Sequence, residues 1–246
     1  MAHGTRSPAG VHTVCQIVDS VRTAASDADV RLAWIELVEP DVPAVLAELA
    51  PDRAAIMVPL LLSSGYHDRV DLPAAIAATR PGTAHGPVLG PDPLLAVALA
   101  DRLTEAGWTP TAAPHHPASA DGPLHQVVGG VGGDVVVLAA AGSSDADAVA
   151  SVRVQAELLA AELAAGGGAP VRVTVGFGSA AAPTVAEAVA TARADGADRV
   201  VIAPYLLAPG HFADRLADAG ADLVAAPLGA HPAVVELILQ RASTGG

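Results

Sequence analysis

The chain contains the same three segments twice, in the same order. The stretches AHGTRSPAG, AAIMVPLLLSSGYHDRVDLPAA and GPVLGPDPLLAVALADRL are echoed by AAGSSDADA, RVVIAPYLLAPGHFADRLADA and AAPLGAHPAVVELILQRA. Each echo follows its partner by about 140 positions. One match could arise by chance in an alanine-rich chain, but three in order indicate an internal duplication. The fold must therefore be built from two related halves, an N-terminal copy and a C-terminal copy.

The segment between the two copies, residues 107–133, is rich in Pro, Ala, Gly and His and has no sustained hydrophobic period. Such a composition is typical of a linker. We therefore predict one domain over residues 1–106 and another over residues 134–246. His115, His116 and His125 of the linker could collect a metal ion, although a solvated loop that carries histidines by composition is the simpler interpretation.

Short apolar runs alternate with amphipathic stretches in each copy. VRLAWIEL, AAIMVPLLL, DVVVLAAA and DRVVIAPYLL are apolar nearly throughout, as strands buried on both faces are. Aromatic residues make up only 2% of the chain, so the core must consist of Ala, Val and Leu side chains that allow close helix-on-sheet packing. We predict an α/β fold of two tandem domains, each a small parallel sheet with helices on both faces.

The charged and sulfur-containing residues exclude several classes of function. The formal net charge is −13, which disfavours nonspecific nucleic-acid binding, and all 13 basic residues are Arg, which excludes a lysine Schiff base. Cys15 is the only cysteine, so an intramolecular disulfide or a cysteine-based zinc site is excluded. With no apolar run near ~20 residues and no signal peptide, we expect a cytoplasmic protein without membrane or nucleic-acid partners, and a monomer with a pseudo-two-fold repeat.

Two histidines of the N-terminal copy are expected at one edge of its sheet. His3 lies in a His-Gly turn, and His67 follows the third predicted strand through the small turn Ser63, Ser64 and Gly65. The carboxyl ends of parallel strands meet at one edge, where ligands bind. Two imidazoles leave most coordination positions of a divalent metal open, which suits transient rather than structural binding, although isolated surface histidines are the commoner case. Glu36 and Glu39 end the second strand at the same edge.

The C-terminal copy departs from this pattern. Ala141 stands where His3 stands, and His211 lies one residue closer to its glycine than His67 does. The second copy therefore retains the fold and loses half of the histidine pair. Its Gly176-Phe177-Gly178 stretch also resembles a dinucleotide-binding turn, but it follows the second strand of its copy and not the first.

AHGTRSPAG, ELVEPDVPAVL, VPLLLSSGYHDRVDLP and GPVLGPDPLL resemble the class II tetrapyrrole chelatases, most closely the sirohydrochlorin chelatases. The resemblance covers nearly the whole chain as two chelatase-like copies. It implies a lyase that inserts Fe²⁺ or Co²⁺ into sirohydrochlorin, for sirohaem or cobalamin synthesis, with the metal as substrate and no permanently bound cofactor. It implies His3 as metal ligand and proton acceptor and His67 as metal ligand.

The resemblance also implies a cradle for the macrocycle. Its predicted members are Leu61, Leu62, Ser63, Ser64, Gly65 and Tyr66, with a further contact near Glu39. Because sirohydrochlorin carries many carboxylates, Arg6 and Arg69, which flank the two histidines in sequence, are predicted to bind them. A non-catalytic tetrapyrrole or metal carrier, and a nucleotide-binding oxidoreductase built on the GFGSAA turn, remain alternatives.

The first strand of the N-terminal copy is expected to be truncated. An apolar strand of about seven residues precedes the turn in the second copy, whereas only Met1 and Ala2 precede His3. A first strand of this kind lies near the middle of a parallel sheet. We therefore expect a gap or an unusually short strand there, and a natural chain that begins roughly six to ten residues earlier, with an apolar strand readable in the upstream DNA.

Overall fold

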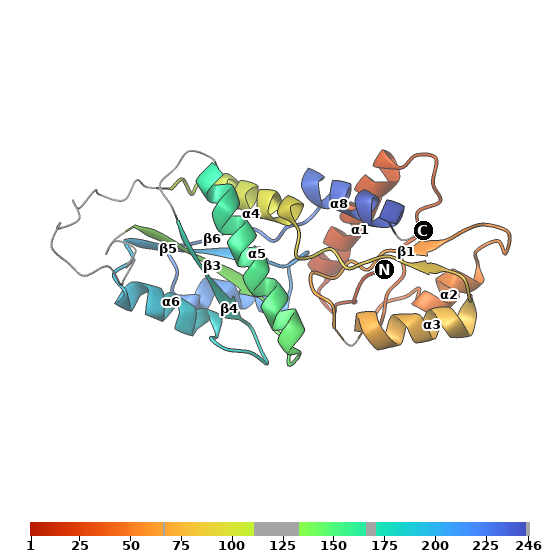
Figure 1. Cartoon of the computed structure of the whole chain (residues 1–246), viewed down its shortest axis with the longest axis horizontal. Helices are drawn as coiled ribbons and strands as arrows, with labels where there is room; N and C mark the ends of the chain where they lie inside the picture. Colours follow the sequence, from red (N-terminus) through yellow and green to blue (C-terminus); the bar gives the residue numbers. More distant parts are fainter. Residues whose placement is uncertain (66, 111–132, 166–170, 245–246) are drawn as a thin grey trace, which may run out of the picture.

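The computed structural model of the 246-residue chain describes residues 1–65, 67–110, 133–165 and 171–244. Most of the predicted linker, with His115, His116 and His125, lies outside these residues. Two separate parallel sheets lie side by side along the long axis of the molecule, each between layers of helices (Figure 1). The α/β architecture with two related sheets is as predicted. In the described part of the chain, no helix is long and apolar enough to cross a membrane.

The sheet of the C-terminal copy has four parallel strands in the order β4-β3-β5-β6. They are β3 (Asp134–Ala140), β4 (Arg172–Phe177), β5 (Arg199–Tyr205) and β6 (Leu223–Val224). All seven residues of β3 are buried, as expected of a central strand with a neighbour on each side. The crossovers run through the helices α5 (Ala146–Ala165) and α6 (Val185–Ala194), and through α7 (His211–Arg215) with a 3₁₀ turn at Leu216–Ala219.

The sheet of the N-terminal copy repeats this order with much shorter strands. β1 (Ile56–Met57) pairs in parallel with β2 (Ala84–His85). Ala2 forms a parallel bridge to Trp34, and the Leu60 N–H donates to the Met1 carbonyl at 2.7 Å. Residues 1–2 therefore occupy the central position that β3 holds in the other sheet. The expectation of an unusually short first strand is confirmed.

The two copies repeat each other down to local backbone detail. Trp34 and Phe177 hold equivalent places: the Trp34 N–H donates to Pro40 O at 3.0 Å, and the Phe177 N–H donates to Pro183 O at 2.9 Å. Both prolines follow cis peptide bonds. The glycines of the two first turns, Gly4 and Gly142, have φ of +92° and +95°, values that favour glycine. This correspondence supports the internal duplication.

The first two helices of the N-terminal copy begin at side chains that cap them. α1 (Pro8–Ala24) starts at Ser7, whose hydroxyl accepts from the Gly10 N–H at 3.3 Å. α2 (Val42–Ala47) starts at Asp41, whose carboxylate accepts from the Ala44 N–H at 2.8 Å. α3 (Leu72–Thr79) follows a π-helical turn, His67–Asp71.

The last helix of each copy packs against elements of the other copy. α4 (Pro93–Glu105) contacts α5 and β5 of the C-terminal copy, whereas α8 (Pro232–Thr244) returns to contact α1 of the N-terminal copy (Figure 1). One apolar core, which includes Val14, Leu99, Val136 and Leu237, runs through both copies. The sequence halves at residues 1–106 and 134–246 each supply one sheet, but each exchanges its final helix.

Candidate active site

His3 lies at the carboxyl end of the short central strand, with its side chain exposed. The turn that follows requires glycine, because a Cβ on Gly4 would lie 1.9 Å from the Glu36 carbonyl oxygen. This close approach brings Glu36, which follows the second strand segment, against the His3 turn. His3 Nδ1 is consequently 3.6 Å from Glu36 Oε1, and both side chains are 48% exposed. An imidazole beside a carboxylate, open to solvent, can take up a proton or a divalent cation.

The predicted cradle loop lies directly beside His3. The Leu60 N–H donates to the Met1 carbonyl, so the segment that contains Leu60 runs beside residues 1–2 in the sheet. The loop that follows Leu60 therefore begins at the same sheet edge as the His3 turn. Residues 61–65 are half-buried and lead into the π-helical turn that begins at His67. The backbone thus brings the His3 turn and the start of the His67 turn to adjacent strand ends. Tyr66 and the His67 side chain lie outside the described structure.

Two hydrogen bonds from other segments of the chain hold this loop in place. The Leu89 N–H donates to Leu61 O at 2.8 Å, and the Tyr205 hydroxyl of the C-terminal copy donates to Leu62 O at 2.9 Å. Tyr205 is 3% exposed, and burial raises the pKa of its hydroxyl far above the ordinary value, so it remains a donor. Gly90 makes room for this contact, because a Cβ there would lie 1.9 Å from the Tyr205 oxygen. The loop is therefore supported by both copies.

A polar cluster beside the His67 turn was missed by sequence reasoning. The Ser64 hydroxyl donates to Asp68 Oδ2 at 2.5 Å, and His85 Nε2, at the end of β2, lies 3.1 Å from Asp68 Oδ1. These contacts connect the loop, the first turn after it and the sheet edge. The signal available in the sequence was the four-residue spacing of Ser64 and Asp68, but the partner His85 is set by the pairing of β1 with β2.

The other predicted substrate contacts are distributed around the edge. Arg69 is paired with Asp145, just before α5, and lies 3.8 Å from Asp147 in the first turn of α5. Arg6 is exposed in the turn before α1. Glu39 is exposed, and its Oε2 accepts from the Asp41 N–H at 3.0 Å. A role for Arg69 toward substrate carboxylates stays a prediction and requires its pair with Asp145 to open.

The equivalent edge of the C-terminal copy is closed by an aromatic ring. Phe212 falls at the position of His67 when the third strands of the copies are aligned, and a Cβ on Gly178 would lie 2.1 Å from its ring. Ala141 replaces His3, and His211 is exposed at the start of α7. The second copy thus has an apolar cover where the first has polar groups.

The same contact removes the basis for nucleotide binding at the GFGSAA turn. A phosphate cradle needs open backbone N–H groups above glycines. Here Phe212 covers Gly178, and a Cβ on Gly176 would lie 2.7 Å from the Val185 Cα of α6. Both glycines therefore serve close packing, which disfavours the nucleotide-binding alternative.

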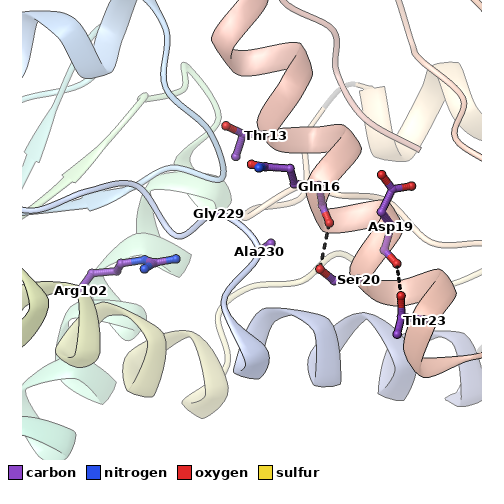
Figure 2. Close-up of a pocket in the computed structure, with 8 residues that line it drawn as sticks. All are labelled: Thr13, Gln16, Asp19, Ser20, Thr23, Arg102, Gly229 and Ala230. Atoms are coloured by element: carbon purple, nitrogen blue, oxygen red, sulfur yellow. Dashed lines mark hydrogen bonds between the residues drawn. The ribbon is translucent and has the colours of Figure 1, made fainter.

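A second concave region lies away from this edge, between α1, α4 and the segment before α8 (Figure 2). Its volume is about 530 Å³, and several of its polar side chains already have hydrogen-bond partners. Ser20 donates to Gln16 O, Thr23 donates to Asp19 O, and Arg102 donates to Leu228 O at 2.8 Å. Within the described residues, no group of three or more metal-ligating side chains occurs in this region or elsewhere.

The CbiX family model matches residues 1–106 and 135–244. The chain therefore belongs to the CbiX family, and the resemblance noted in its motifs is confirmed. The two matched segments coincide with the two copies, which is consistent with tandem domains of one family. No curated protein sequence matches the chain significantly.

Solved structures share the fold over the full length. SirB from Bacillus subtilis, solved with Fe³⁺, has a TM-score of 0.76 at 23% identity, over 98% of this chain and 92% of SirB. The sirohydrochlorin chelatase SirB from Bacillus subtilis subspecies spizizenii, in complex with cobalt, has a TM-score of 0.68 at 20% identity, over 98% and 91%. CbiX, described as the terminal enzyme of sirohaem biosynthesis in denitrifying bacteria, has a TM-score of 0.65 at 19% identity, over 100% and 97%.

Proposed function

We propose that this chain is a metal chelatase that inserts Fe²⁺ or Co²⁺ into a sirohydrochlorin-type tetrapyrrole. The observation that carries the proposal is the convergence of the His3 turn and the His67 turn on adjacent strand ends, in a member of the CbiX family. The solved relatives with Fe³⁺ and cobalt support a metal as substrate. Sirohaem or cobalamin synthesis, a cytoplasmic location and a monomeric state belong to the same proposal.

The chemistry requires a group that accepts both a metal and a proton. Metallation removes two protons from pyrrole nitrogens while the divalent cation passes from protein ligands to the macrocycle. A neutral imidazole binds such a cation and accepts a proton near pH 7. His3 is exposed beside Glu36, whose negative carboxylate attracts a divalent cation to that place. We assign His3 as metal ligand and proton acceptor, and His67 as the second metal ligand.

The macrocycle is assigned to the loop of residues 61–66. Leu89 and Tyr205 hold Leu61 and Leu62 by hydrogen bonds, so the remaining backbone groups and small side chains of residues 61–65 can face a flat ligand. We assign Arg6, which is exposed in the turn before α1, to a substrate carboxylate, and we assign Arg69 the same role after it leaves Asp145. Glu39 lies on the same rim. The C-terminal copy, with Ala141 and Phe212 at the equivalent positions, supports the loop and does not metallate.

The absorption spectrum of the macrocycle tests this function directly. Sirohydrochlorin is mixed with Co²⁺, or anaerobically with Fe²⁺, and with protein at a small fraction of the tetrapyrrole concentration. We expect conversion of all the tetrapyrrole to its metallated spectrum, at a rate well above the protein-free rate. A change limited to one equivalent of protein would instead identify a carrier, and no change would refute both.

A matched pair of variants tests the assignment of His3. His12, exposed on α1, is the control because it lies on the helix after the turn. His3→Ala should lower the metallation rate at least about tenfold, and His12→Ala should leave it within about twofold. Equal rates in the two variants would remove His3 from the mechanism.

A further inference from the structure

Leu37 is an exposed leucine beside the His3 turn. It is 56% exposed, more than any other large apolar residue in the described part of the chain. A Cβ on Gly4 would lie 3.6 Å from Leu37 Cβ, so the base of this side chain lies against the turn that follows His3. Single exposed apolar residues are common on protein surfaces. The backbone at Leu37 distinguishes it from such residues.

Leu37 has a backbone conformation that favours glycine. Its φ is +65°, and the Val38 N–H donates to the Glu36 carbonyl at 2.8 Å, so Leu37 is the central residue of a γ-turn of the rare, strained kind. A left-handed backbone is unfavourable for a residue with a Cβ but not for glycine. Strain of this kind is concentrated at functional sites. Neither local conformation nor burial explains a leucine at this position.

The segment around Leu37 is held in place on its carboxyl side. Val38 is half-buried and packs against the core that runs through both copies. The Trp34 N–H donates to Pro40 O at 3.0 Å, which closes the loop that contains the γ-turn. Leu37 is therefore presented to solvent by a loop with its own hydrogen bonds.

The C-terminal copy has the same turn without the leucine. The Ala181 N–H donates to Ser179 O at 2.7 Å, and Ala180 between them has φ of +56°. Ala180 is therefore the counterpart of Leu37, and it is also exposed. A large apolar side chain occurs at this turn in the copy that carries His3 and not in the other copy.

The cradle loop leaves an apolar ligand in need of further contacts. Leu61 and Leu62 are half-buried, and they pack against two different core clusters. Part of their apolar surface is therefore already covered. The rest of the described loop, residues 63–65, is Ser-Ser-Gly and offers little apolar surface.

Leu37 and the cradle loop flank the same central segment of the sheet. Ala2 bridges to Trp34 on one side, and on the other side the Leu60 N–H donates to the Met1 carbonyl. Leu37 follows the first of these neighbours, and the cradle loop follows the second. A flat macrocycle that lies over the turn between them can contact the loop on one side and Leu37 on the other.

Resting on the function proposed above, we propose that Leu37 contacts the apolar surface of the tetrapyrrole and sets its binding affinity. The neighbouring His3 and Glu36 are polar, so the leucine provides the apolar contact on this side of the site. It contributes to binding of the macrocycle and not to binding of the metal ion.

The test is a titration of metal-free sirohydrochlorin with the 246-residue chain, followed by the absorption spectrum of the macrocycle. Leu37→Asn keeps the size of the side chain and tolerates the left-handed backbone, but it removes the apolar surface. We expect its Kd to rise at least about fivefold, as expected when about half of a leucine side chain is no longer buried. Leu37→Met should recover most of the affinity.

Three further measurements separate a substrate contact from a structural role. In the metallation assay, Leu37→Asn should raise KM and leave kcat within about twofold, because the contact is present before and during the reaction. Its Kd for Co²⁺ alone should stay within about twofold of the parent value, and its melting temperature should be equal or higher. Val154→Asn, at a 44% exposed position on α5, is the control and should leave the Kd for sirohydrochlorin within about twofold.

The outcomes distinguish this inference from the proposed function. A parent chain that binds and metallates sirohydrochlorin, together with an unchanged Kd for Leu37→Asn, would overturn the role of Leu37 and leave the function standing. Weaker Co²⁺ binding, a lower melting temperature or an equal loss in Leu37→Met would also overturn it, because Leu37 would then support the site without contacting the macrocycle. A parent chain that neither binds nor metallates sirohydrochlorin would overturn both.

Discussion

Arg241 of α8 anchors the exchanged helix to the N-terminal copy. Its Nε donates to Val88 O at 3.0 Å, and its Nη2 donates to Leu89 O at 3.0 Å and to Asp92 Oδ2 at 2.8 Å. The side chains of Arg241 and Asp92 are only 20% and 15% exposed. Asp92 also begins α4, since its carboxylate accepts from the Leu94 N–H. The guanidinium of Arg241 therefore connects α8 to the segment that leads into α4, so one side chain links the two exchanged helices.

Arg241→Met removes the charge and keeps most of the apolar stem. Breaking a buried ion pair by removing one partner costs ~3–5 kcal/mol, because the remaining charge stays buried. The residual exposure of both side chains, and the Leu94 N–H that still serves Asp92, place the cost at the lower end, at about 3 kcal/mol. For a chain of this length that lowers the melting temperature by about 6–12 °C.

The repeat supplies a matched control at Arg102, the counterpart of Arg241 in α4. Arg102 donates twice to Leu228 O, but its acidic partner Glu105 is 56% exposed. A surface ion pair contributes ~0–1 kcal/mol, so Arg102→Met should cost only about 1–2 kcal/mol. Urea unfolding of the two variants and the parent chain measures the difference. An Arg102→Met loss equal to or larger than that of Arg241→Met would refute the burial argument.

Three further outcomes are expected. Gly4→Ala should destabilise the chain by at least about 2 kcal/mol more than Gly82→Ala, as measured by urea unfolding. Both glycines have positive φ, but only on Gly4 would a Cβ lie 1.9 Å from a carbonyl oxygen. Tyr205→Phe should cost about 1 kcal/mol and speed hydrogen exchange in residues 61–65, whereas an unchanged exchange rate would contradict its support of the loop. The Val200 N–H, and then Arg193, lower the pKa of Asp222 below its ordinary 3.8. Ionised Asp222 therefore stabilises the folded chain above pH 3.8, and this stabilisation is lost as the pH falls through the lowered pKa. The difference in unfolding free energy between the parent chain and Asp222→Asn should therefore close on acidification.

The duplication made most of the fold predictable. Ordered echoes and apolar runs indicated two parallel sheets, and the position of Met1 and Ala2 indicated a short central strand. The exchange of α4 and α8 was not predictable, because both helices are amphipathic and fit either sheet by pattern alone. Their partners are chosen by tertiary contacts such as Arg241 with Asp92, which join residues 149 positions apart.

The segments that form the candidate site were predictable from the sequence, but the side chains that hold these segments in place were not. The His3 turn, the loop of residues 61–65 and the substitution at Ala141 follow from motif positions on parallel strands. Tyr205 and His85 were missed, since each reaches the loop from a different strand across the sheet edge. The pair of Arg69 with Asp145 was also missed, because it depends on how the two copies face each other.

The central claim is that the N-terminal copy alone performs metallation. The most direct measurement is the rate of metal insertion into sirohydrochlorin by His67→Ala and by His211→Ala, followed spectrally under identical conditions, with circular dichroism confirming that both variants retain the parent fold. The account predicts a loss of at least about tenfold for His67→Ala and a change within about twofold for His211→Ala. Equal losses in the two variants, or a loss only in His211→Ala, would contradict it.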